Sequence, residues 1–345
     1  MVAPAALRRH PFLSFGVLAA GVLLASRAVV ASAAFRVRPE IVGMAVTVDL
    51  TVFLTALFVA TVVRARALPP VTAVAVFLAG ATVAASLLPP GARPLASGIR
   101  ALAAPADLLL AGWLAVRAGR VRRRLRAIGD ALPFEDAFRR AVRDAIGPYR
   151  TADAIAAEVS LLSLALAPRR RAPHVPAGAV PFTTHLRCGQ GAVLAALALA
   201  GVAETLAAHV LLAHWSARWA WIATGFAIYS FVWLLGDWRG LALRPTLLRA
   251  DRLHVRIGVR WQAEIPLRAI RMVCAGPDAR GHPRAAIASP LGAPNLYLHL
   301  GAPVELEGLL GLRRRGEVVG LRVDEPDRLR AALVERCGPG TARVR

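Results

Sequence analysis

Five ionisable side chains lie inside long apolar stretches, and their types could do chemistry there. They are Arg27, Asp49, Asp107, Glu204 and His209. An ionisable group in the centre of a membrane span costs about 2.5–3.5 kcal/mol, so each such residue needs a reason. The first four lie about six to nine residues from the outer ends of the spans defined below, at one depth of roughly 9–14 Å. We expect a polar site open to the extracytoplasmic side, such as a binding pocket, an ion path or a metal site.

A second interpretation of these residues is purely structural. In it, Arg27 pairs with Asp49 on the neighbouring helix, while the remaining acids are protonated or face a water-filled gap. A metal site on the fifth span is disfavoured, because Glu204 and His209 are five residues apart, about 140° around a helix, and do not share a face. We therefore predict neither a bound metal nor a cofactor.

The residue types of the whole chain exclude several kinds of enzyme. All 43 basic side chains among its 345 residues are Arg, so the chain has neither the Lys of a P-loop nor a Lys for a Schiff base. Its three cysteines lie far apart and match no zinc or disulfide pattern: Cys188, Cys274 and Cys337. Ser160 and Ser163 have no base and acid at a recognisable spacing, and His185 is expected to be an interfacial residue. We predict no catalytic residue, and enzyme activity is the less favoured class.

The elements that must position the five ionisable residues are membrane spans. The chain is 57% hydrophobic with a mean hydropathy of +0.53, and a span needs about 20 mostly apolar residues. Six stretches are predicted to span: residues 12–34, 41–63, 71–88, 101–116, 191–213 and 219–236. Tryptophans flank the last two spans, as expected at membrane interfaces. Although a net charge of +22 could indicate nucleic-acid binding, these apolar stretches favour a lipid bilayer as the partner, and we expect no nucleic acid.

The distribution of Arg predicts the orientation. With the N-terminus inside, the inner segments include Arg8, Arg9, Arg64, Arg66 and residues 117–187, which hold 14 Arg. The outer loops hold few, and cytoplasmic loops are the ones enriched in Arg. We predict a multi-pass protein of the bacterial inner membrane with both termini in the cytoplasm.

Two alternatives to this topology remain open. Residues 154–167 are apolar and could form a seventh span, but they are few, include Glu158 and precede three arginines, so a helix in the interface or packed on the bundle is favoured. Arg8 and Arg9 precede an apolar run and an Ala31-Ser32-Ala33 pattern, which resembles a cleavable signal peptide.

A basic segment, residues 117–190, follows the fourth span. Five arginines cluster at its start and are predicted to contact anionic lipid headgroups: Arg120, Arg122, Arg123, Arg124 and Arg126. The alternative is that they only set the orientation of the spans. Phe134, Phe138, Val142 and Ile146 then recur at helical spacing, which predicts an amphipathic helix.

After Arg244 the pattern changes to short alternating segments typical of strands. Strands are predicted at 247–249, 253–257, 259–265, 271–273, 296–300, 304–306 and 317–323, with a loop over 276–294. A closing helix is predicted with Asp324 as its N-cap and Pro326 in its first turn. This order resembles bacterial PH-like domains, on residues 253–258, 264–270 and 323–326. The resemblance implies a bent antiparallel barrel closed by one helix, with a role in interaction or assembly.

Together these observations predict an α-helical polytopic membrane bundle of six spans plus a small C-terminal β-barrel-like PH domain closed by one α-helix. The expected division is a four-span region (1–116), a basic cytoplasmic segment (117–190), a two-span hairpin (191–236), the PH-like domain (244–337) and a tail (338–345). The function favoured is a membrane-anchored interaction or regulatory protein with a protein partner at the PH-like domain. The alternative is a small transporter or membrane enzyme that uses the five ionisable residues.

Overall fold

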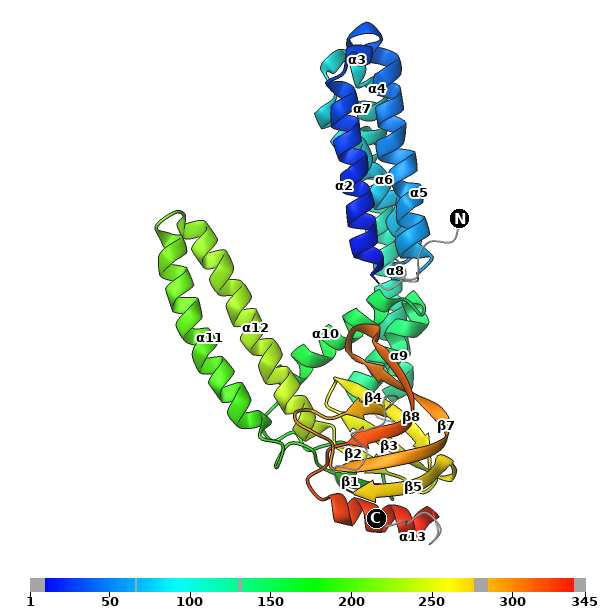
Figure 1. The fold of residues 1–345 in the computed structure, drawn as a ribbon, viewed down its shortest axis with the longest axis vertical. Helices are drawn as coiled ribbons and strands as arrows, with labels where there is room; N and C mark the ends of the chain where they lie inside the picture. Colours follow the sequence, from blue (N-terminus) through cyan, green and yellow to red (C-terminus); the bar gives the residue numbers. More distant parts are fainter. Residues whose placement is uncertain (1–9, 66, 130–131, 276–284, 338–345) are drawn as a thin grey trace. The chain divides into compact units, whose positions relative to one another are not determined.

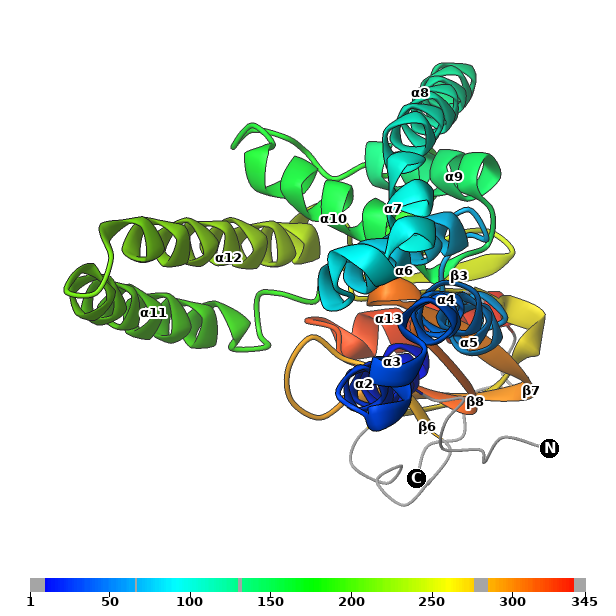
Figure 2. The same ribbon diagram turned by 90° about the horizontal axis from the view of Figure 1, so that it is seen from above.

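The computed structural model describes residues 10–65, 67–129, 132–275 and 285–337 (Figures 1 and 2). The chain divides into two compact units: unit 1 comprises 1–132 and 137–153, and unit 2 comprises 133–136 and 154–345. The predicted N-terminal tail with Arg8 and Arg9, Arg66, residues 276–284 of the predicted loop and the tail 338–345 lie outside the described residues.

Unit 1 is built from apolar helices. They are α2 (Pro11–Val30), α3 (Ala33–Val37), a continuous helix of α4 (Pro39–Val48), η1 (Asp49–Phe53), α5 (Leu54–Phe58) and η2 (Val59–Val63), then α6 (Thr72–Leu87), the turn η3 (Pro90–Ala92), α7 (Pro94–Ala101) and α8 (Ala103–Ile128). Three of these helices begin with Pro, whose fixed φ suits a first turn. Gly80 lets α6 approach η1 closely, because a Cβ there would overlap the carbonyl oxygen of Leu50.

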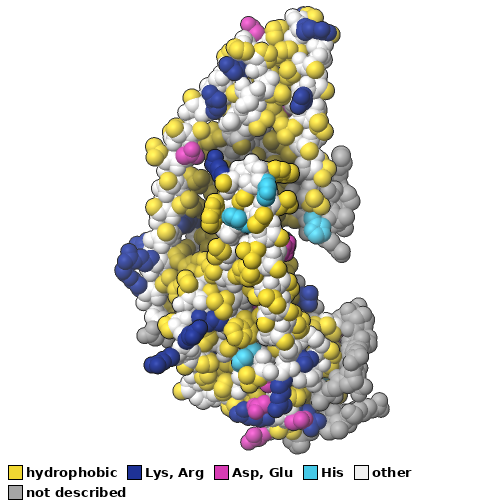
Figure 3. Space-filling view, turned by 90° about the vertical axis from the view of Figure 1, so that its left-hand side faces the viewer, with side chains coloured by type: hydrophobic (Ala, Val, Ile, Leu, Met, Phe, Trp, Pro, Cys, Tyr) yellow, Lys and Arg dark blue, Asp and Glu magenta, His cyan; other side chains and the backbone are white. Residues whose placement is uncertain are grey.

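Within the described part of the chain, five helices are long and apolar enough to cross a membrane. They are Pro11–Val30, Pro39–Val63, Pro94–Ile128, Gln190–Ala213 and Ala217–Leu243. The third predicted span, residues 71–88, is not among these five. It forms the helix α6, whose 16 residues extend only ~24 Å against a hydrocarbon core of about 30 Å. In Figure 3 hydrophobic side chains are exposed over the helices, with charged side chains scattered among them. The amphipathic helix is present as α9 (Phe134–Ile146). The helix α10 (Arg150–Leu166) contains residues 154–166 of the alternative seventh span and is not among the five.

Unit 2 combines a helical hairpin with a sheet. The hairpin consists of α11 (Gln190–Ala213) and α12 (Ala217–Leu243). The sheet has eight strands: β1 (Val180–Phe182), β2 (Thr246–Leu248), β3 (Arg252–Ile257), β4 (Trp261–Pro266), β5 (Ile270–Ala275), β6 (Ala285–Ala288), β7 (Leu296–Gly308) and β8 (Arg313–Leu321). Short turns η5 (Leu267–Ala269) and η7 (Leu309–Gly311) join two of the strand pairs, and α13 (Pro326–Cys337) follows the sheet.

The sheet is mixed and open, which corrects the predicted closed barrel. Its strands follow the order β1-β2-β3-β4-β7-β8-β6, with β5 also paired to β7. The end strands β1 and β6 are not paired with each other among the described residues, and β6 runs parallel to β8. The core lies on one face, where alternate residues of β3, Leu253, Val255 and Ile257, are fully buried. The predicted closing helix is present, and its Leu329 and Leu333 pack into this core.

Three details of the strand prediction were wrong. β6 lies inside the predicted loop 276–294, and β7 is one strand where two were predicted, with a register shift between His299 and Val304. The strand β1 had no signal, because it is only three residues long with Pro181 at its centre. Pairing of β1 with β2 therefore brings residues before the hairpin into the same sheet as residues after it.

Candidate functional site

The predicted polar residues of the spans are divided between the two units. Arg27 lies on α2, Asp49 opens the π-helical turn η1, and Asp107 lies on α8, all exposed on unit 1. Glu204 and His209 lie on α11 in unit 2. Within the described residues Arg27 and Asp49 form no ion pair. The rest of that alternative, in which the other acids are protonated or face water, stays a prediction, as does a single layer that contains all of these residues.

Glu204 lines a cavity of about 400 Å³ between α11 and α12. The lining is mostly apolar, and its other polar side chains are Thr205, Thr224 and Ser230. His209 lies beside it: its Nδ1 is 2.7 Å from the hydroxyl of Thr224, and its ring packs edge-on against Trp221. The hydroxyl of Thr224 also lies 3.0 Å from the carbonyl oxygen of Ala220, to which it donates. Glu204 therefore lines the cavity, whereas His209 contacts one of its lining residues, Thr224.

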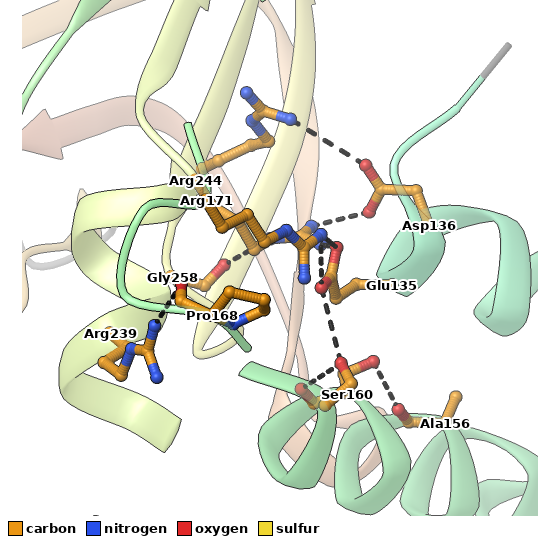
Figure 4. A network of polar contacts seen from close by, with 11 residues as sticks. Glu135, Asp136, Ala156, Ser160, Pro168, Arg171, Arg239, Arg244 and Gly258 are labelled. Carbon is orange, nitrogen blue, oxygen red and sulfur yellow. Dashed lines mark hydrogen bonds and ion pairs between the residues drawn. The ribbon is translucent and has the colours of Figure 1, made fainter. Parts of the chain in front are cut away.

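Unit 2 also contains a buried charge cluster, formed by Glu135, Asp136, Arg171, Arg244 and Arg256 (Figure 4). Asp136 accepts a hydrogen bond from Nη2 of Arg244 at 2.6 Å and lies 3.9 Å from Nη1 of Arg256. Oε1 of Glu135 lies 2.9 Å from Nη2 of Arg171. The side chains of Arg244 and Arg256 are each only 2% exposed. Since Arg244 directly follows α12 and Arg256 lies on β3, the cluster ties the start of α9 to the helical hairpin and the sheet.

The electrostatics of the cluster favour a structural role. Burial would raise the pKa of Asp136, but the charge and hydrogen bond of Arg244, together with the charge of Arg256, hold that pKa below its usual range. Burial and the charge of Arg244 lower the pKa of Arg256 to about 10, so Arg256 stays protonated at neutral pH. Burial and the charge of Arg256 lower the pKa of His254 to about 4, so its ring is neutral. Removal of either partner of such a buried ion pair destabilises the fold, because the remaining charge stays buried without compensation.

Two further contacts fasten the base of α12. Asp237, which is 1% exposed, accepts a hydrogen bond from Nε of Arg260 at 2.7 Å and a second from Nη2 of the same side chain. Arg239 donates to the carbonyl oxygens of Ala165 at 3.0 Å and Pro168 at 2.9 Å, which lie at and just beyond the end of α10. These residues connect α12 to the sheet and to α10.

Asp324 does not act as the predicted N-cap. The helix α13 begins at Pro326, and the Asp324 carboxylate instead accepts hydrogen bonds from the backbone N–H groups of Leu186 and Arg187, at 3.1 and 2.7 Å. Burial would raise the pKa of Asp324, and these bonds, with one from Thr183, lower it overall. The carboxylate therefore holds the loop that leads into α11.

The remaining predicted residues are found on surfaces or in backbone contacts. The five arginines predicted to contact lipid, Arg120, Arg122, Arg123, Arg124 and Arg126, are exposed on the last turns of α8. Ser160 donates to the carbonyl of Ala156, and Ser163 to the carbonyl of Ser160. Among the described residues no three His, Cys, Asp or Glu side chains are placed to hold a metal ion.

The charge cluster was not found by sequence reasoning. The signal that could have found it is Arg256, a charge between the buried Val255 and Ile257. In the same way, Asp237, an acid in the last turns of an apolar helix, could have indicated the separate contact with Arg260. No family model, curated protein or solved structure matches this chain.

Proposed function

We propose that this chain is a multi-pass protein of the bacterial inner membrane that acts as a membrane-anchored interaction or regulatory protein. In this proposal α6 spans together with the five longer helices, locally thinning the bilayer, which gives six spans. An even number of spans and the Arg-rich inner segments then place both termini in the cytoplasm. The unit 2 sheet, which resembles PH-like domains in sequence, presents its surface to a protein partner there.

The observation that carries the proposal is that α12 continues without a break from its apolar stretch into the core of the sheet. Leu241, near its end, is fully buried in the same core as β3 and α13. Gly236 packs so closely on α10 that a Cβ would overlap the carbonyl oxygen of Leu161. With the Asp237–Arg260 contact, these features hold the sheet rigidly on the last span. A rigid connection suits a protein that displays a surface at a set distance from the bilayer.

The groove that contains Glu204 favours a second candidate function, a small transporter or membrane enzyme. A carboxylate in the span, beside hydroxyl groups and a cavity of about 400 Å³, is the kind of group that binds a proton or a cationic solute. Glu204 is exposed on α11 and takes part in no ion pair among the described residues.

Topology tests the membrane part of the proposal. Reporter fusions after Gly147, after Pro176 and at Arg345 should all report the cytoplasm, and the full chain should resist extraction at alkaline pH. An outside signal at Pro176 and Arg345 would make 154–167 a span and would place the sheet outside the cytoplasm.

Complementation tests the choice between the two functions. A deletion strain should be complemented by Glu204→Gln but not by a chain in which residues 245–345 are replaced by a fluorescent protein. The fluorescence of that chimera in the membrane fraction checks that its spans still insert. The reverse pattern would favour the transporter or enzyme.

A further inference from the structure

The turn between β7 and β8 presents apolar side chains to the outside of unit 2. This tip, residues 309–312, holds Leu310 and Leu312 at 52% and 57% exposure. Three exposed arginines follow directly: Arg313, Arg314 and Arg315. Apolar side chains directly beside arginines suit a membrane interface, where the apolar groups reach the acyl chains and the arginines meet anionic headgroups.

The backbone of the tip is held in place. The backbone of Leu310 has a left-handed conformation, with φ 57° and ψ 29°, which residues other than Gly rarely adopt. Gly308 donates to the carbonyl of Leu312 at 2.6 Å, and Leu309 donates to the carbonyl of Arg260 at 2.9 Å. A strained residue in a well-bonded turn keeps its exposed side chain in one direction, which points to a role for that exposure.

The tip lies beside the base of α12. Leu309 packs on the cluster of Leu161, Leu164 and Val259, together with Trp233 and Leu243 of α12. Figure 1 shows the β7–β8 turn on the side of the sheet from which α12 leaves it. Since Trp233 marks the inner interface of the sixth predicted span, the tip lies near the level of the lipid headgroups.

The charges beside the tip complement an anionic surface. Arg313 pairs with Glu305 at 3.1 Å and Arg314 stacks on Trp261 at 4.6 Å, while Arg315 makes no ion pair among the described residues. Glu307, opposite Arg313 in the ladder, is the other carboxylate of this hairpin end. Three arginines against two carboxylates leave an excess of positive charge next to the leucines.

We propose that the β7–β8 tip docks on the anionic inner leaflet of the bilayer that α11 and α12 span. Leu310 and Leu312 enter the interface, and Arg315 contacts headgroup phosphates. This contact is separate from the α8 arginines and would give the sheet a second attachment besides α12. It rests on the proposed membrane topology, because only an inserted α12 brings the tip to a lipid surface.

A fluorophore at the tip tests the proposal. The full-length chain, with its three native cysteines replaced by Ala, would carry an environment-sensitive NBD label at Leu310→Cys. The matched control is Arg268→Cys, an exposed site in η5 beyond the far end of β4, roughly 20 Å from the strand residue that pairs with Gly308. Both proteins would be reconstituted into vesicles of phosphatidylcholine alone or with phosphatidylglycerol.

With phosphatidylglycerol present, the label at 310 should shift to the blue and be quenched by lipids spin-labelled near the headgroup, whereas the label at 268 should stay water-like. Adding Arg315→Gln should lower the ratio of inserted to free tip by about fivefold. Water-like emission from the label at 310, in protein that resists alkaline extraction, would overturn the tip contact. Equal insertion of the tip into vesicles with and without phosphatidylglycerol would overturn the contact between Arg315 and anionic headgroups. Loss of the protein from the membrane fraction would instead count against the proposed topology. A label at Leu312→Cys repeats the test if the first variant does not fold.

Discussion

Replacement of Asp136 by Asn should destabilise unit 2 far more than loss of an exposed ion pair. The carboxylate compensates two guanidinium groups that are each 2% exposed, Arg244 at 2.6 Å and Arg256 at 3.9 Å. Removing one partner of a buried pair typically costs about 3–5 kcal/mol, because the remaining charge stays buried without compensation. In a unit of this size that cost corresponds to a decrease of roughly 6–20 °C in the unfolding midpoint.

The chain contains a matched control on the same sheet. Glu264 pairs with Arg252 at 2.9 Å, but these side chains are 54% and 43% exposed, so Glu264→Gln should cost only about 0–1 kcal/mol. Unfolding would be followed in detergent by tryptophan fluorescence, with Trp233 and Trp261 close to the elements concerned. A double variant, Asp136→Asn with Arg244→Met, should recover part of the loss, since it removes one of the uncompensated charges.

This reasoning is refuted if Asp136→Asn lowers the midpoint no more than Glu264→Gln does. It is also refuted if adding Arg244→Met makes the Asp136→Asn protein less stable by the full amount of the single Arg244→Met change, because independent effects would mean that the two groups do not interact.

Three further predictions concern the same unit. The pKa of His254 is about 4 in the fold against an ordinary 6.5, so the unfolded chain takes up a proton at this residue before the folded chain does. The contribution to the free energy of unfolding is therefore complete above pH 6.5 and is lost as pH falls towards 4, by about 3 kcal/mol. Denaturation series between those pH values should show this loss in the native chain and not in His254→Phe. Gly236→Ala should destabilise the unit by about 1–3 kcal/mol, because the new Cβ overlaps the carbonyl oxygen of Leu161. The control Gly225→Ala lies on the same helix with open space around it and should stabilise by up to about 1 kcal/mol. Equal unfolding midpoints for the two variants would show that the α10–α12 contact is not tight. Leu310→Gly should raise the midpoint in detergent by relieving a left-handed Leu, worth about 1 kcal/mol, and a decrease would show that the Leu310 side chain packs on the protein itself.

The local elements of this protein were largely predictable from its sequence. Runs of apolar residues predicted all five helices that are long enough to span among the described residues, and helical spacing predicted α9. The hairpin of β3 and β4 and the helix α13 follow from alternation and from Pro326. These features depend on residues close in the chain, because transfer of a helix to lipid and burial of one strand face are sums over contiguous positions.

The candidate site was predictable only in part. Glu204 and His209 are polar residues in an apolar run; in the structure Glu204 lines a cavity, and His209 contacts Thr224, which lines the same cavity. The charge cluster escaped prediction because its members are distant: Arg244 and Asp136 are 108 positions apart. Arg139 and Arg140 are as suitable in type as Arg244, so only the path of the chain selects the partner.

By itself, the sequence determined that the chain has membrane-length apolar helices, which end carries the sheet, and where charge is scarce. The tertiary structure alone decided that the sheet stays open, that β1 and β6 join it, and that Asp324 binds a loop instead of capping a helix. It also decided which charges are buried together. The physical reason is that hydropathy and periodicity act locally, whereas strand pairing and ion pairing depend on which distant segments the fold brings within a few ångströms of each other.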